Sequence, residues 1–395
     1  MAEETPKIRT IAVGTIARVE GEGALRVTVK DGSVQDVELQ IFEPPRFFEA
    51  FLQGRHYNEV PDIVARICGI CPVAYQMSAV HAIEQIFGLH ISGALRDLRR
   101  LIYCGEWIES HALHVFMLQA PDFLGYDSGI AMAKDHPGIV TRGLRLKKAG
   151  NAIMTLLGGR SVHPVSVKVG GFSRVPFRRE LDGLKDELLW ARDAAAETVR
   201  WVAGFEYPEF PPDYTCVALR HSDEYPFNEG RIVAGPGLDI SVDEFERHFS
   251  EHQVPYSNAL HCTLQGAPYL VGPLARVNLN HDRLPQAVMH VLAETGLSLP
   301  LRNPFHGIVA RSIEILYAFE ESLRLIDRYE PPSVPSLPVT VRAGTGMACT
   351  EAPRGILYHR YRVDGDGVIR EAKIVPPTSQ NQGRIEQDLR LFLPR

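Results

Sequence analysis

The sequence lacks several features that would indicate a particular class of protein. Its 395 residues contain only six cysteines, too few for a disulfide-stabilised scaffold. It contains no uncharged apolar stretch of about 18 residues or more, so it predicts no membrane span. Residues 1–23 are acidic and then mixed, without the apolar core of a secretory signal. These absences favour a reducing, cytoplasmic setting.

The charge balance argues against a second group of functions. The chain has 42 basic and 48 acidic residues and a formal net charge of -6. This charge gives no bulk attraction to nucleic acid or to an anionic membrane. No GxGxxG stretch follows a predicted strand, so the chain carries no sign of a dinucleotide-binding fold. The hydrophobic fraction of 45% is ample for a large core.

The periodicity of apolar residues predicts an α+β fold with a helical-bundle core and peripheral β-hairpin and sheet subdomains. Alternating β-branched residues over 9–42 predict strands. Long amphipathic stretches over 75–204 predict helices that bury their apolar faces against each other. We expect Pro121 to end one of these helices. Residues 268–279, in a proline-rich region, are expected to form a strand or a loop.

These patterns divide the chain into five segments. They are an N-terminal β subdomain (1–45), a helical bundle (46–204), a mixed β and loop subdomain (205–284), returning core helices (285–330), and a C-terminal β-hairpin with the start of a helix (331–395).

Cys68 and Cys71, in RICGICP, are the only two cysteines close together in the sequence. A thioredoxin-like dithiol would need a βαβ context, whereas here we predict a helix before and after the pair. A structural zinc site usually needs two such pairs, and no second CxxC is present. Two buried free cysteines remain an alternative. Arg66 and Gly69 favour an electropositive turn whose thiolates bind a soft metal, although only two ligands are visible.

RICGICP resembles the N-terminal cysteine motif of nickel–iron hydrogenase large (catalytic) subunits. Further stretches resemble motifs of this family, in the expected order and over nearly the whole chain. They are ARVEGEG (17–23), PPRFFEAFLQGR (44–55), IESHALHVF (108–116), EAPRGILYHRY (351–361) and PPTSQNQ (376–382). The cytosolic, pyridine-nucleotide-linked branch, which includes the sulfhydrogenases, looks most similar. The resemblance implies reversible heterolytic cleavage of H2 to a hydride and a proton.

The resemblance also implies the metals. A nickel–iron centre, with cyanide and carbon monoxide on iron, is held in this family by four cysteine thiolates. Cys68 matches a terminal nickel ligand and Cys71 a ligand that bridges both metals, and thiolates suit these metals. Glu49 matches a carboxylate that binds a structural magnesium ion, and Gln380 is expected near that ion.

Further residues match family positions around the centre. Glu20 matches a glutamate that relays protons, although by itself it would be interpreted as a surface residue of a strand. Arg354, after Pro353, matches an arginine over the open metal position; by itself it would be interpreted as a surface ion-pair residue. His111 and His114 are expected near the centre and the small-subunit contact, where they orient groups or move protons. Without the resemblance, a buried pair of core histidines would be the simpler interpretation.

The chain departs from the family pattern at three places. Tyr75 stands where the family often has histidine, and Ser110 where many members have aspartate; we interpret both as tuning. The family's second motif, Asp-Pro-Cys-x-x-Cys-x-x-His, is not present in these 395 residues. With two of four thiolates, the centre is expected to be incomplete or empty, and a missing C-terminal segment is the favoured explanation. The remaining cysteines are isolated in the sequence: Cys104, Cys216, Cys262 and Cys349.

The resemblance implies partners as well. Electrons from a buried centre need a path, so we expect an iron–sulfur small subunit and diaphorase-type subunits that carry NAD(P) and iron–sulfur clusters. Maturation factors are also expected. The alternative function is a non-catalytic structural or interaction subunit that keeps the scaffold without the metal. Such relatives lack the first cysteine pair, whereas this chain keeps it together with Arg66, Glu20 and Arg354, which favours the enzyme.

Overall fold

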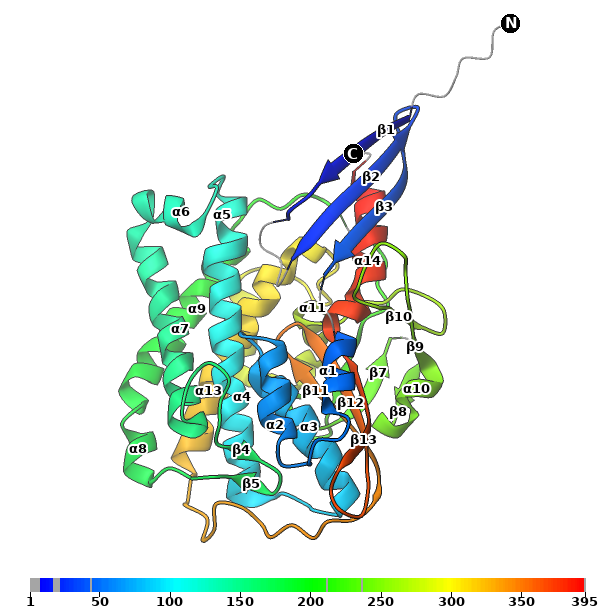
Figure 1. Cartoon of the computed structure of the whole chain (residues 1–395). Helices are drawn as coiled ribbons and strands as arrows, with labels where there is room; N and C mark the ends of the chain where they lie inside the picture. The colour runs from blue at the N-terminus through cyan, green and yellow to red at the C-terminus, as the bar shows by residue number, and fades with distance from the viewer. Residues whose placement is uncertain (1–7, 17–21, 43–44, 211, 236, 394–395) are drawn as a thin grey trace, which may run out of the picture.

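Four long helices form a bundle on the left-hand side of Figure 1. The computed structural model describes residues 8–16, 22–42, 45–210, 212–235 and 237–393. Helix α4 packs against α7 and α13, and α9 packs against the same two helices. The predicted α+β fold with a helical-bundle core is therefore confirmed. The four helices are α4 (Gly93–Leu113), α7 (Pro137–Gly158), α9 (Lys185–Ala203) and α13 (Gly307–Asp327).

Shorter helices surround this bundle. They are α1 (Pro45–Leu52), α2 (Val60–Val64), α3 (Pro72–Phe87), α5 (Ala120–Phe123), α6 (Gly129–Asp135), α8 (Arg178–Asp182), α10 (Phe245–His248), α11 (Pro273–Asn280), α12 (Gln286–Glu294) and α14 (Pro377–Phe392). Single 3-10 turns are η1 (Ala65–Ile67), η3 (Val242–Glu244), η4 (His281–Arg283) and η5 (Pro304–His306). Among the described residues, no helix combines the length and apolar character needed to cross a membrane.

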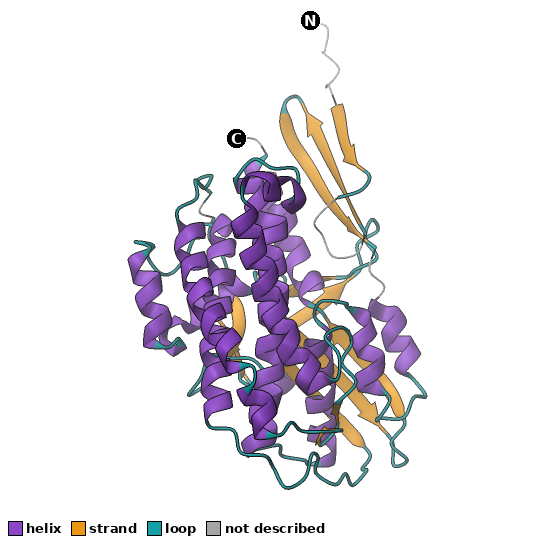
Figure 2. Ribbon diagram, turned by 90° about the vertical axis from the view of Figure 1, so that its left-hand side faces the viewer, coloured by secondary structure: helices purple, strands orange, loops and turns teal. Residues whose placement is uncertain are grey.

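The strands form small antiparallel sheets. One sheet, in the order β1-β2-β3, projects beyond the helical body, and Figure 2 shows it at the upper right. A second sheet, in the order β11-β12-β13, is covered by α3. The strands are β1 (Ile8–Val13), β2 (Gly23–Lys30), β3 (Ser33–Ile41), β4 (Val167–Lys168), β5 (Gly171–Phe172), β6 (Val217–Arg220), β7 (Arg231–Ala234), β8 (Leu238–Ile240), β9 (Phe249–His252), β10 (His261–Leu264), β11 (Gly344–Ala352), β12 (Gly355–Val363) and β13 (Ile369–Val375).

Two predictions about proline-containing segments are wrong. Pro121 does not end a helix, because α4 continues through a π-helical segment, η2 (His114–Gln119), into α5, which contains Pro121. Pro273 begins α11, where we expected a strand or a loop. The N–H groups of a first helical turn have no partner within the helix, so Pro273 loses nothing there. Pro121 therefore lies within a continuing helix, whereas Pro273 marks the start of one.

A buried arginine joins the bundle to the sheet β11-β12-β13. Arg276 of α11 is fully buried, and its Nε and Nη2 donate to the two carboxylate oxygens of Glu314 on α13, each at 2.8 Å. Its Nη1 donates to Glu351 of β11 at 2.8 Å. The guanidinium carbon lies 4.2 Å from the ring centre of Trp107 on α4. Removing one partner of such a buried ion pair typically costs about 3–5 kcal/mol.

His111 of α4 completes this cluster. Its Nε2 lies 2.9 Å from Glu314. Burial is the main cause that lowers the pKa of His111 to about 4, and the nearby Arg276 and Arg311 act in the same direction, against the raising effect of Glu314. The imidazole is therefore neutral near neutral pH. Because the Glu314 carboxylate only accepts, Nε2 carries the proton and donates it.

The helices α4 and α7 approach each other closely through glycine. A Cβ at Gly150 of α7 would lie 2.7 Å from the carbonyl oxygen of Gly105 and 2.9 Å from the amide nitrogen of Glu109. Both atoms belong to the backbone of α4 and have little freedom to move. This close contact sets the spacing of the two helices, and α4 carries His111.

We expect His111 to make the protein lose stability on acidification. Since its folded pKa of about 4 lies below the ordinary 6.5, the unfolded chain binds more protons between these values. The stabilising contribution is complete above about pH 6.5 and is lost as the pH falls towards 4, by up to about 1.4 kcal/mol per pH unit. His111→Gln keeps a donor for Glu314 and cannot titrate, so its urea-unfolding midpoint should fall less steeply. Glu351, whose pKa is raised to about 7 mainly by burial, acts in the opposite direction in both proteins.

The control for this measurement is His290→Gln, whose histidine side chain is 76% exposed. It should follow the wild-type curve between pH 4 and 7. Equal slopes for His111→Gln and the wild type would contradict the assignment of this proton to His111.

Gly150→Ala should destabilise the protein by about 1–3 kcal/mol, because the added methyl group overpacks the contact between α4 and α7. The higher helix propensity of alanine offsets only about 1 kcal/mol. Gly138→Ala, near the start of the same helix, is the matched control, since its added Cβ would meet nothing within 4 Å. Thermal unfolding should separate the two variants, and a similar loss in both would show that the close contact is not the cause.

Candidate metal centre

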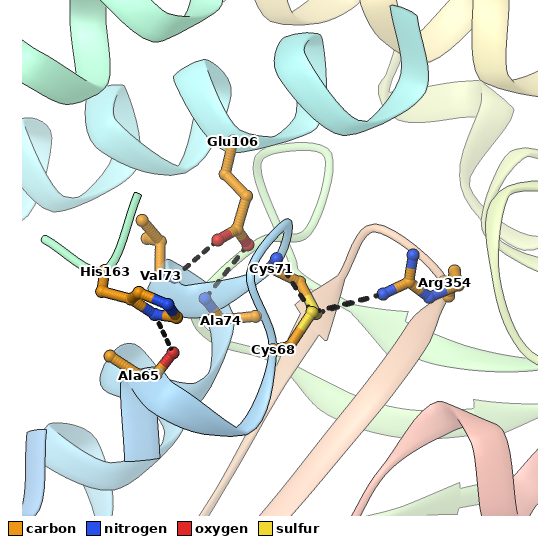
Figure 3. Close-up of a disulfide and its surroundings, with 8 residues drawn as sticks. All are labelled: Ala65, Cys68, Cys71, Val73, Ala74, Glu106, His163 and Arg354. Carbon is orange, nitrogen blue, oxygen red and sulfur yellow. Dashed lines mark hydrogen bonds between the residues drawn. A yellow bond between two sulfur atoms is a disulfide. The ribbon is translucent and has the colours of Figure 1, made fainter. Parts of the chain in front are cut away.

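Cys68 and Cys71 lie in a tight turn between η1 and α3 (Figure 3). A helical segment precedes the pair and another follows it, as predicted. Cys71 is the N-cap residue of α3, and its backbone N–H donates to the sulfur of Cys68 at 3.1 Å. The two residues are only 6% and 5% exposed, so both sulfurs are held inside the protein.

The structure joins these two sulfurs as a disulfide, with Cα atoms 5.5 Å apart. The ligand of a metal is the thiolate, which a disulfide does not offer. Metal binding by this pair therefore requires its reduced form. Reduction leaves two neighbouring sulfurs on one short turn, which is the arrangement that a shared soft metal needs.

A guanidinium group lies against both sulfurs. Nη2 of Arg354 is 3.1 Å from the sulfur of Cys71 and 3.7 Å from that of Cys68. Arg354 and the preceding Pro353 form the turn between β11 and β12; Figure 3 shows Arg354 to the right of the cysteines and Glu106 of α4 above them. In the reduced pair, this positive charge favours the thiolate form.

Arg66 does not supply this charge, contrary to the sequence prediction. Its side chain is exposed, and its Nη2 pairs with Asp62 at 3.0 Å. Asp62 precedes it by four residues, which places the two side chains on the same helical face. The local ion pair therefore turns Arg66 away from the sulfurs.

A buried carboxyl group holds the start of α3 behind the cysteines. The two oxygens of Glu106 on α4 accept the backbone N–H groups of Val73 at 2.5 Å and Ala74 at 3.1 Å (Figure 3). These N–H groups have no partner within their own helix. Burial raises the pKa of Glu106 well above its ordinary value, although both hydrogen bonds lower it. On the other side of the turn, Nδ1 of His163 lies 2.6 Å from the carbonyl oxygen of Ala65.

Sequence reasoning missed Glu106. The available signal is a charged residue on the buried face of α4, between the fully buried Tyr103 and Trp107. A carboxyl group at such a position needs partners, and a helix N-terminus supplies them.

A cavity of about 630 Å³ lies beside the cysteine turn. It is lined by Gly69 and Ile70 of the turn, by Ser110 and His114, and by Arg354, with β3 and α14 on the opposite side. Burial lowers the pKa of His114 well below its ordinary value, and its Nδ1 has no partner among the described residues. The π-helical segment begins at His114, and such segments often occur at functional sites. Ser110, His114 and Arg354 thus face one cavity.

Two other predicted residues face elsewhere. His111 belongs to the cluster around Arg276 and Glu314, so the two neighbouring histidines have different surroundings. Tyr75 of α3 is buried, and its ring centre lies 5.8 Å from that of His359 on β12. Glu20 lies outside the described residues.

The residues predicted for magnesium lie at a separate place, where α1 meets β13. Glu49 accepts the N–H of Ile374 at 2.7 Å, and burial raises its pKa. Glu251 of β9, which sequence reasoning missed, has a pKa raised to about 7 by burial and, more weakly, by the charge of Glu49. Gln380 is fully buried and donates to the carbonyl oxygens of Ile356 and Val375. Its contacts are those of a packing residue between α14 and the sheet.

The sulfur pair fits a soft metal in its chemistry, its burial and its neighbouring positive charge. It supplies two donors. In the part of the chain that the structure describes, no group of three or more His, Cys, Asp or Glu side chains could hold a metal ion. In reduced form, these two sulfurs would supply two donors of a thiolate site.

Comparisons with known proteins agree with this geometry. The nickel-dependent hydrogenase family matches residues 46–136, which include the cysteine turn and α4. The chain is 33% identical to sulfhydrogenase 1 subunit alpha of Pyrococcus furiosus over 386 residues, 97% of this chain and 90% of that protein. It is also 33% identical to sulfhydrogenase 2 subunit alpha of the same organism over 382 residues, 96% and 90% of the two chains.

A solved structure shares the fold over nearly the full length. The crystal structure of an NAD+-reducing NiFe-hydrogenase in the H2-reduced state has a TM-score of 0.86 and 26% identity, and the match covers 98% of this chain and 93% of that one. The buried cysteine pair, the arginine against it and these similarities lead to one conclusion. The chain belongs to the nickel-dependent hydrogenase family as a large (catalytic) subunit, an oxidoreductase that acts on H2.

Proposed function

We propose that this chain is the H2-activating subunit of a cytoplasmic hydrogenase that exchanges electrons with NAD(P) through an iron–sulfur small subunit. The observation that carries the proposal is the buried pair Cys68 and Cys71 with the guanidinium of Arg354 against both sulfurs. Similarity to an NAD+-reducing hydrogenase supports the choice of electron acceptor, and similarity to two sulfhydrogenase subunits supports the H2 chemistry. We also propose diaphorase-type subunits and maturation factors as partners.

The residues of this chain would act as follows. Reduced Cys68 and Cys71 would hold their side of a nickel–iron centre, whose iron we propose to carry cyanide and carbon monoxide; when bound, such a centre would supply the Lewis acid for heterolytic cleavage of H2. The low exposure of both cysteines keeps water away from the sulfurs. Arg354 presents a planar set of N–H donors beside them, where charge develops during the reaction. Glu20 accepts the released proton and passes it to solvent.

We propose a second metal site at Glu49. The Glu49 and Glu251 carboxyl groups interact electrostatically, and hard oxygen ligands of this kind suit magnesium. Such an ion would stabilise the contact between α1 and β13, away from the cysteines. Gln380, whose amide is used by backbone carbonyls, supports this region through packing.

The number of sulfur ligands supports a second candidate. The described residues provide two donors of a site that has four in the family, so a non-catalytic subunit that keeps the scaffold without the metal is the alternative. Metal content separates the two candidates directly.

The gene product, purified anaerobically with its partners, should contain about one nickel ion per chain and show infrared bands of iron-bound CO and cyanide. Cys71→Ser should lose both signals because it removes a thiolate ligand. Cys104→Ser is the matched control, since Cys104 is a buried free cysteine of α4. Absence of nickel and of these bands from the wild-type protein would contradict the catalytic proposal and favour the non-catalytic alternative.

Glu20→Gln should slow hydrogen–deuterium exchange between D2 and water by about 10²–10⁴-fold, because an amide cannot relay a proton. Nickel content should stay unchanged, since this side chain is not a proposed ligand. Glu22→Gln, at an exposed position two residues away, should exchange at the wild-type rate. Wild-type exchange in Glu20→Gln would remove Glu20 from the proton path.

A further inference from the structure

We propose that Arg276 is a positioning residue of this hydrogenase: its buried guanidinium fixes the turn that carries Arg354 and so keeps Arg354 against the cysteine sulfurs. The inference rests on the proposed function only for the role of Arg354 in H2 chemistry. The claim that Arg276 fixes the turn depends solely on contacts among described residues.

The side chain of Arg276 contacts the backbone of this turn. Besides its bonds to Glu314 and Glu351, Nη1 donates to the carbonyl oxygen of Ala352 at 2.8 Å and Nη2 to that of Pro353 at 2.9 Å. These are the two carbonyl groups immediately before Arg354. Every N–H of the guanidinium is then used, three for carboxylates and two for the turn.

The helix that carries Arg276 contacts the turn a second time. Gly272, immediately before α11, has φ +113°, and a Cβ there would lie 2.7 Å from the carbonyl oxygen of Arg354. Gly355, at the other end of the turn, has φ +138°, and its Cβ would lie 2.4 Å from a methyl carbon of Val271. Glycine adopts such angles readily and leaves room for the two backbones. The turn therefore packs against the residues that immediately precede α11. It is also hydrogen-bonded to the side chain of Arg276, which lies on α11.

Arg276 is itself held rigidly. Glu314 and Glu351 are fully buried, and Trp107 lies against the guanidinium plane. A lysine at this position would keep the charge. Its ammonium group has fewer N–H donors than a guanidinium, and all of them lie on one nitrogen, so it cannot donate to two carboxylates and two carbonyl groups together. Arg276→Lys therefore removes the fork geometry while leaving a cation in place.

The first test measures backbone mobility in the reduced full-length chain by hydrogen–deuterium exchange with mass spectrometry. Arg276→Lys should accelerate exchange of the amides around 354–356 by roughly ten-fold, because local opening becomes easier. Arg100→Lys is the matched control: Arg100 is equally buried, pairs with Glu321 and donates to the carbonyl oxygen of Tyr225. It should change exchange at the turn by less than about two-fold. Equal acceleration in both variants, or none in Arg276→Lys, would overturn the proposal.

The second test asks whether Arg276 acts through Arg354. Arg276→Lys should lower kcat for H2 oxidation, whereas in an Arg354→Ala background it should have no further effect beyond about two-fold. Independent, multiplicative losses would overturn the positioning role. If the wild-type protein shows no H2 chemistry, the proposed function fails, and the exchange measurement still decides whether Arg276 orders the turn.

A milder variant guards against loss of folding. Glu351→Gln preserves the side-chain volume and removes the charge of one partner of Arg276. It should accelerate exchange at the same turn, by less than Arg276→Lys does. Unchanged exchange at the turn in this variant would count against the proposal even if Arg276→Lys cannot be purified.

Discussion

The positive charge of Arg276 is stable inside the protein only because every one of its protons is accepted. Burial alone would raise the pKa of Glu314, yet Arg276 and His111 lower it to about 2, so this carboxylate is ionised. Glu351 has a pKa raised to about 7, mainly by burial. The cluster is therefore close to neutral, which limits the unfavourable desolvation of its members. The cluster fixes α4, α11, α13 and β11 relative to one another. The parts of the candidate site come from these elements and from α3.

The cysteine turn depends on the same arrangement. Glu106 reaches it from α4 and holds the start of α3, and His163 contacts its other end. Arg354 reaches the cysteine turn from the turn between β11 and β12. A turn supported from several separate elements presents its two sulfurs in one place before any metal is bound. Such preorganisation is what a metal site with a soft ligand pair requires.

Local patterns in the sequence predicted the cysteine turn and the helical segments beside it. They failed at two prolines and at the cation that meets the sulfurs. The cysteine turn lies between helical segments as expected, because helix spacing and a proline after Cys71 are local signals. Pro121 lies inside a helix that we expected it to end, and Pro273 begins a helix where we expected a strand or a loop. Arg66 pairs with the nearby Asp62, whereas the cation at the sulfurs is Arg354, nearly three hundred positions further along the chain. Local proximity in sequence could not reveal that contact.

The sequence by itself determined the chemical identity of the candidate site: two cysteines on one turn, and a set of motifs in the order of the hydrogenase large subunits. These are properties of short segments, and short segments carry their own turn and helix signals. Only the tertiary structure decided which charged groups meet the sulfurs, that His111 and His114 face different surroundings, and that Glu106 and Arg276 support the site. The reason is physical. A buried charge must find its partner wherever the packing of the helices brings one, and that packing depends on contacts between residues that are far apart in the chain.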